Sequence, residues 1–179
     1  LIPADITNVK YDEAISTVEF GKATATGYTF VGWFKDESGT DEVVYTDKNL
    51  TAEDNVTVTL YAHWTANTGT KFAIKYFLQD ISVNGTALLD TYTLIETEER
   101  QGITASSVDA KLVSKYFKDG AFVESLLPGY TYAENKTEKE TGTIAPDGST
   151  VLEIYLTRKP YTVTLTAGKG IETVSGNGT

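Results

Sequence analysis

Few residues in this chain could transform a small molecule. It has no cysteine and a single histidine, His63, which excludes thiolate nucleophiles, disulfides and metal sites built from several histidines. The sequence also lacks the G-x-S-x-G turn that would present a serine nucleophile. The sequence therefore predicts no catalytic residue, no cofactor and no metal ligand, and we expect the chain not to be an enzyme.

Aromatic side chains are the remaining candidates for ligand contact. Trp33 and Trp64 could form a platform for a sugar ring, but Trp64 shares its strand face with aliphatic residues, which favours burial. Trp33 stands between Phe30 and Phe34, and the sequence leaves its orientation open. The predicted ligand contacts are Trp33, Phe34 and Tyr61.

Other polar residues are better explained as surface. The acidic loops 36–42 and 47–55 hold enough oxygens for calcium, but neither has the spacing of an EF-hand, so we expect solvated loops. His63 alternates with threonines on the polar face of its strand, and we expect it to be exposed. Lys75 lies on an outer strand face, which disfavours a role in an isopeptide crosslink between side chains.

Charge and composition limit the classes of partner. The chain has 179 residues with a formal net charge of -10, which argues against nucleic-acid binding because that needs clustered Lys and Arg. No apolar run approaches the roughly 18 residues that span a bilayer. The chain is 40 % hydrophobic, rich in threonine and tyrosine, and free of methionine, so we expect a β-rich piece of a longer, exported bacterial chain.

Period-two alternation of apolar and polar residues predicts most of the secondary structure. The turn dipeptide Asn84-Gly85 joins two such runs into a hairpin over residues 71–96. A capping pattern at Ser106 and apolar residues at four-residue spacing predict a helix over 107–118, and a weaker pattern predicts one over 11–18. The remaining strands are predicted at residues 56–65, 151–157 and 161–167.

The sequence repeats itself. Gly27-Tyr28-Thr29-Phe30 recurs as Gly129-Tyr130-Thr131-Tyr132, and each copy is followed by a polar loop and an alternating strand. Small polar residues at 66–70 and the Pro160 joint divide the chain. We therefore expect two small modules, residues 1–66 and 67–159, with residues 160–179 beginning a further repeat or a linker.

Two family resemblances follow from these motifs. The segments GYTFVGWF, from Gly27, and LYAHWT, from Leu60, make residues 9–66 resemble the Listeria–Bacteroides repeat, the internalin-type B repeat of bacterial surface proteins. The family's usual first strand is mostly missing from the start of this chain. Residues 71–159 are similar to MucBP-like, mucin-binding-type repeats, on the segments FAIKYF, PGYTY and DGSTVLEIY.

The resemblances imply a fold and a setting. They imply a mainly β or α+β chain of tandem β-grasp-like (ubiquitin-like) modules, each a small mixed sheet with at most one short helix. They also imply a non-catalytic stalk and adhesion scaffold at the bacterial cell surface, contacting neighbouring repeats and attached to the cell wall through parts outside this segment. The alternative is a module that binds host glycan, mucin or a surface protein.

Overall fold

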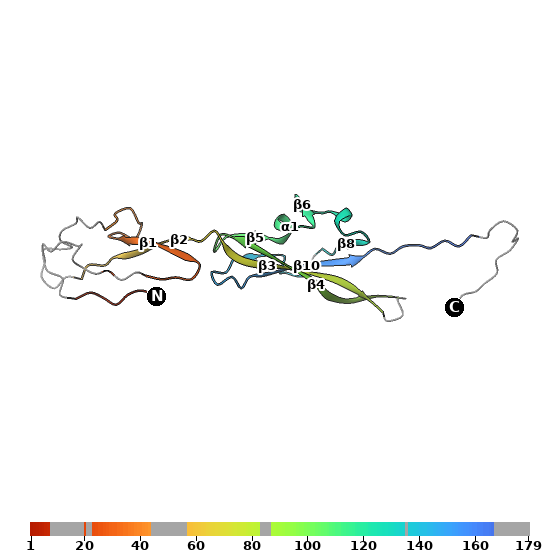
Figure 1. Cartoon of the computed structure of the whole chain (residues 1–179), viewed down its shortest axis with the longest axis horizontal. Helices are drawn as coiled ribbons and strands as arrows, with labels where there is room; N and C mark the ends of the chain where they lie inside the picture. Colours follow the sequence, from red (N-terminus) through yellow and green to blue (C-terminus); the bar gives the residue numbers. More distant parts are fainter. Residues whose placement is uncertain (8–19, 21–22, 44–56, 83–86, 135, 167–179) are drawn as a thin grey trace.

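A computed structural model describes residues 1–7, 20, 23–43, 57–82, 87–134 and 136–166 (Figure 1). The fold is mainly β, as predicted. Besides its strands, the described part of the chain contains one turn of α-helix and one 3-10 turn, η2 (Glu124–Leu126). The elements are β1 (Tyr28–Phe34), β2 (Tyr61–Ala66), β3 (Thr70–Ile81), β4 (Leu88–Gly102), β5 (Ser107–Asp109), α1 (Ala110–Val113), β6 (Phe117–Lys118), β7 (Ala121–Phe122), β8 (Tyr130–Tyr132), β9 (Thr141–Thr143) and β10 (Val151–Arg158).

Strands β1 and β2 form an antiparallel two-stranded sheet, here called the β1–β2 ribbon. The register shifts at Val31, between Phe30 and Gly32, so this residue forms a β-bulge. The strand predicted over 56–65 begins only at Tyr61. This residue pairs with Phe34, the last residue of β1, so the described residues before it have no strand of the ribbon to pair with.

A four-stranded sheet, in the order β4-β3-β10-β8, follows the ribbon. Strand β3 pairs with β4 in the predicted antiparallel hairpin and with β10 in parallel. Strand β8 closes the other edge, antiparallel to β10. Because β3 and β10 lie side by side and parallel, the chain between them must cross over one face of the sheet, and residues 103–129 and 133–150, on either side of β8, form this crossover. Residues 70–158 are called the four-stranded unit below.

The core lies between this sheet and the crossover. Alternate residues of the two central strands point into it, as the alternation predicted, and Ile74, Tyr76, Ile154 and Leu156 are completely buried. The crossover contributes the other buried side chains. The whole buried cluster is Phe72, Ile74, Tyr76, Ala110, Phe117, Ile144, Leu152, Ile154 and Leu156.

The predicted helix over 107–118 is wrong. Residues 107–109 pair as β5 with β9, and α1 starts only at its cap Asp109, whose carboxylate accepts a hydrogen bond from the Lys111 N–H. The helix ends at Ser114, which has extended backbone angles, and β6 follows in a short hairpin with β7. Leu112, one of the apolar residues whose four-residue spacing predicted the helix, is 70 % exposed. The apolar spacing therefore reflects separate anchors of an irregular crossover rather than one helical face.

Other predictions fail or lie outside the described residues. The segment 161–166 forms no strand, and its side chains are exposed. The predicted helix 11–18, the turn Asn84-Gly85 and the whole of the loop 47–55 lie outside the described residues. In the described ranges, no helix reaches the length and apolar character that a membrane crossing requires.

The ribbon and the four-stranded unit follow one another directly. Only Asn67, Thr68 and Gly69 separate β2 from β3. In Figure 1 the two sheets lie one after the other along the long axis of the picture. The predicted linker at 66–70 is therefore a tight connection, and what holds its two sides together decides how freely they can bend.

Candidate functional site

The three residues predicted to contact a ligand do not share a surface. In the β1–β2 register Trp33 pairs with Ala62, whereas Phe34 pairs with Tyr61, so Trp33 faces the opposite side of the ribbon from the other two. Phe34 is buried. Trp33 is half-buried and meets the Phe30 ring edge to face at 5.6 Å. The ribbon therefore offers no common aromatic platform.

His63 was expected to be exposed, and this is wrong. Its ring is half-buried and lies 4.5 Å from the Phe34 ring centre. The loop after β1 also packs against this ring. Gly39 approaches the imidazole so closely that a Cβ there would overlap the ring, and the positive φ of Gly39, 72°, also suits glycine. His63 therefore packs under the loop that follows β1.

In the acidic loop 36–42, the carboxylate of Asp36 accepts hydrogen bonds from other residues of the same loop. Asp36 accepts hydrogen bonds from the N–H groups of Thr40 and Asp41, at 3.1 and 2.7 Å, and from the hydroxyl of Ser38. These bonds, led by that of Ser38, hold the Asp36 pKa below its ordinary value. Among the described residues, no group of three or more His, Cys, Asp or Glu side chains is arranged to hold a metal ion.

Lys75 and an aromatic cluster occupy the face of the four-stranded sheet that points away from the core. Lys75 is half-buried there, as the alternation predicted, and not enclosed. Phe77 and Tyr155 stack on adjacent strands at 4.8 Å, and the ring of Tyr92 meets Tyr155 edge to face at 5.1 Å. The ammonium group of Lys136 lies over the Tyr92 ring at 4.9 Å. These rings mostly contact one another.

The contact between the ribbon and the four-stranded unit centres on one backbone oxygen. The carbonyl of Gly27 accepts a hydrogen bond from the N–H of Asn67 at 2.9 Å and another from the hydroxyl of Thr104 at 2.7 Å. The N–H of Thr104 in turn donates to the Asn67 carbonyl at 2.9 Å. Three segments that are distant in sequence therefore meet at this oxygen. We call this group of residues the junction.

Further groups close the junction on both sides. The hydroxyls of Thr70 and Thr104 lie 2.6 Å apart, and both residues are buried. On the ribbon side, the Thr29 hydroxyl donates to the Asn67 side-chain oxygen at 2.7 Å. Pro146 covers Gly27 so tightly that a Cβ on this glycine would lie 2.7 Å from the Pro146 Cα. The junction is thus a packed, hydrogen-bonded contact with no room for a larger residue at Gly27.

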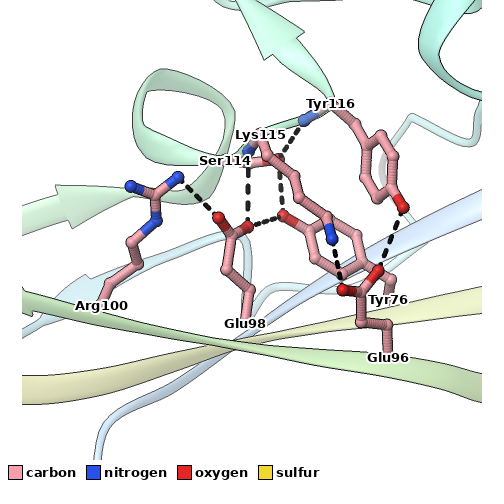
Figure 2. A network of polar contacts seen from close by, with 7 residues as sticks. All are labelled: Tyr76, Glu96, Glu98, Arg100, Ser114, Lys115 and Tyr116. Carbon is pink, nitrogen blue, oxygen red and sulfur yellow. Dashed lines mark hydrogen bonds and ion pairs between the residues drawn. The ribbon is translucent and has the colours of Figure 1, made fainter.

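A network of polar side chains fixes the crossover to the sheet (Figure 2). Tyr76 reaches through the core and donates its phenol proton to the Glu98 carboxylate. Its oxygen also lies 2.8 Å from the Ser114 hydroxyl, and because a phenol has only one proton, Ser114 must donate in that pair. Arg100 completes this side with a contact of 2.6 Å to Glu98.

The other half of the network lies nearer the surface. Glu96 accepts from the ammonium group of Lys115 and, at 3.0 Å, from the hydroxyl of Tyr116. Its contact with Lys115 holds the Glu96 pKa below its ordinary value and raises the pKa of Lys115. Burial and the bond to Glu98 raise the pKa of Tyr76. A protonated lysine and a neutral phenol are poor nucleophiles, so this network is suited to holding structure and not to covalent chemistry.

Sequence reasoning found one end of the junction and missed the other. The Gly-Tyr-Thr-Phe motif was singled out, and its Gly27 supplies the acceptor. Thr104 and Pro146 lie in connections with no distinctive pattern, and they meet Gly27 only because the fold brings three turns together. The signal available for them is weak: a threonine just after a long strand and a proline in a turn.

One comparison with known proteins finds a match for part of the chain. Residues 3–63 match the family model of the Listeria-Bacteroides repeat domain, which confirms the resemblance inferred for residues 9–66. This repeat occurs in bacterial surface proteins. No curated protein and no solved structure matched the chain. The resemblance of residues 71–159 to MucBP-like repeats stays a prediction.

Proposed function

We propose that this chain is a non-catalytic part of the repeat region of a bacterial cell-surface protein, where it acts as a stiff stalk that holds other parts away from the cell wall. The observation that carries the proposal is the junction. A spacer must resist bending between its modules, and a three-residue connection locked by the shared acceptor at Gly27 supplies that resistance. The match to a surface-protein repeat supports the cellular setting.

The same proposal includes the module type. In the four-stranded unit the first and last strands are central and parallel, the second strand lies at one edge, and a crossover covers one face. This strand order supports a β-grasp module in which the usual helix is reduced to the single turn α1. We assign residues 67–159 to one such module and residues 1–66 to the preceding one.

Adhesion is the second candidate function, and one observation favours it. The outward face of the sheet carries Phe77, Tyr92 and Tyr155 together with Leu94, which is 43 % exposed. An aromatic patch of this kind can contact a host glycan, mucin or protein. Because the rings stack on one another and Lys136 lies over Tyr92, little free ring face remains for a sugar. We therefore propose the spacer as the main function and adhesion as the second candidate.

Solution scattering and binding screens of the whole chain distinguish the two candidates. The spacer function predicts an elongated scattering profile and no hit on a glycan array or in a mucin pull-down. A specific hit that is lost in Tyr92→Ala, and kept in Tyr61→Ala on the ribbon, would assign the chain to adhesion. A scattering profile of a compact particle, or of two parts that move freely relative to each other, would contradict the stalk.

A further inference from the structure

The repeated Gly-Tyr-Thr motif builds the same backbone structure twice. Gly27 precedes β1, and its carbonyl accepts from Asn67, the residue that follows β2, at 2.9 Å. Gly129 precedes β8, and its carbonyl accepts from Lys159, the residue that follows β10, also at 2.9 Å. Both glycines have positive φ, 77° and 86°. The backbone at Gly129, at the end of the four-stranded unit away from the ribbon, is therefore built like the backbone at Gly27 in the junction.

The two glycines differ in what covers them. Gly27 is packed under Pro146, and its carbonyl takes a second hydrogen bond from Thr104. At Gly129, a Cβ would meet only the Tyr161 hydroxyl, at 3.8 Å. Within the described residues, Gly129 also has no donor that corresponds to Thr104. The backbone at Gly27 is thus covered by a neighbouring module, whereas the backbone at Gly129 has free space beside it.

The segment that leaves this end has the pattern of a strand without a sheet. Tyr161, Val163 and Leu165 alternate with threonines, and these three side chains are 76, 82 and 90 % exposed. At the junction, the chain that leaves the ribbon instead enters β3, whose alternate residues are buried. A period-two apolar row of this kind is typical of a strand with one buried face.

We propose that the Gly129 carbonyl and the Gly129 surface form a docking site for a further module of the same kind as the four-stranded unit, placed after residue 160. This inference rests on the proposed stalk function and adds the atoms of the next contact. A hydroxyl equivalent to that of Thr104 donates to the Gly129 carbonyl, and a turn equivalent to that of Pro146 covers the glycine. Because β3 and β10 run parallel from the occupied end to the open one, modules joined this way extend in a line.

A tandem chain tests the proposal. In it, a copy of residues 67–158 directly follows Arg158, so that the copied Asn67 takes the place of Lys159. Gly129→Ala is then introduced into the unmodified chain and into the first four-stranded unit of the tandem. In the unmodified chain, where the site is open, we expect the loss in melting temperature to match that of Gly120→Ala, another glycine of positive φ with open space. In the tandem we expect a clearly larger loss, because the alanine meets the copied proline.

The outcomes separate this inference from the proposed function. If Gly129→Ala lowers the melting temperature equally in both chains, the docking site is overturned. This holds whether the copy is unfolded or is folded without docking. Spin labels across the first junction of the same tandem report on the stalk independently. A narrow distance distribution there with no added loss at Gly129 would reject only the docking site, whereas a broad one would reject the stiff stalk itself. Thr104→Val in the copy alone should reduce the extra loss in melting temperature that Gly129→Ala causes in the tandem. Thr97→Val in the copy, at an exposed position, should leave that extra loss unchanged.

Discussion

Thr104 donates its hydroxyl hydrogen to the carbonyl oxygen of Gly27 at 2.7 Å, across 77 residues of sequence. Gly27 directly precedes strand β1 of the ribbon, whereas Thr104 follows the long edge strand β4 of the four-stranded unit. Removing that hydroxyl hydrogen leaves the Gly27 carbonyl with the N–H of Asn67. This pair therefore reports directly on whether the two parts of the chain behave as one body.

Thr104→Val should weaken the junction without enlarging the side chain. The change removes the bond to Gly27 and leaves the buried Thr70 hydroxyl without its 2.6 Å partner. We expect a loss of about 1–3 kcal/mol in the free energy of unfolding, measured by chemical denaturation. Thr97→Val, at an exposed position of β4, is the control. Equal stabilities of the two variants would contradict the role given to Thr104.

Gly27→Ala and Gly120→Ala separate backbone strain from packing. Both glycines have positive φ, 77° and 78°, but a Cβ at Gly27 would lie 2.7 Å from Pro146, whereas at Gly120 the nearest atom is a Leu112 methyl at 3.7 Å. Gly120→Ala should therefore cost about 1 kcal/mol from strain, and Gly27→Ala should cost distinctly more. Thermal unfolding of both variants measures the difference. Indistinguishable midpoints would mean that Pro146 is not packed on Gly27.

The central strand β10 should show the largest effects in the core. Ile154 is completely buried in the core cluster, and Ile154→Ala removes three carbon atoms from it. We expect a loss of about 2–5 kcal/mol in unfolding free energy. Val151→Ala, on the same strand but 36 % exposed, should lose much less. A small effect at Ile154 would place the core elsewhere.

The polar network should make stability depend on alkaline pH. Burial, with the bond to Glu98, raises the pKa of Tyr76, so the neutral phenol is favoured in the folded chain. That stabilisation is fully present below pH 10.0, the ordinary tyrosine value, and is lost as the pH rises through the raised pKa. Tyr76→Phe should therefore cost about 1 kcal/mol or more at neutral pH, and its deficit should shrink above pH 10.

Denaturation of Tyr76→Phe and the unchanged chain at several pH values provides the measurement. Tyr61→Phe, on the ribbon and outside the network, is the matched control and should show a deficit near zero throughout. A Tyr76→Phe deficit that stays constant from neutral to alkaline pH would show that the phenol does not carry the effect.

Strands with a clear period of two were predictable from the sequence. The buried positions of β3 and β10 follow from alternation alone, because one face of each strand packs on a single core. The helix over 107–118 was wrong because its apolar residues anchor a bent crossover, and four-residue spacing looks the same in both cases. His63 was misplaced because the loop that covers it is polar, so nothing in its own strand indicates burial.

The junction could be predicted only in part. A glycine before a strand indicates a special backbone conformation, and its repetition indicated that it matters. Its partners are chosen by topology: Thr104 and Pro146 come from two turns that the parallel pairing of β3 and β10 brings to the same end of the sheet. Such long-range contacts leave no periodic trace in a single sequence.

The most direct test of the central claim is a distance distribution across the junction. The chain has no cysteine, so Glu37→Cys and Lys118→Cys, both at exposed positions on the two sides of the junction, can be spin-labelled without other changes. Pulsed electron–electron double resonance should give a narrow distance distribution in the otherwise unchanged chain. The distribution should become broader when Thr104→Val is added. A broad distribution in the chain with Thr104 intact would mean that the two parts move independently and that the chain is not a stiff stalk.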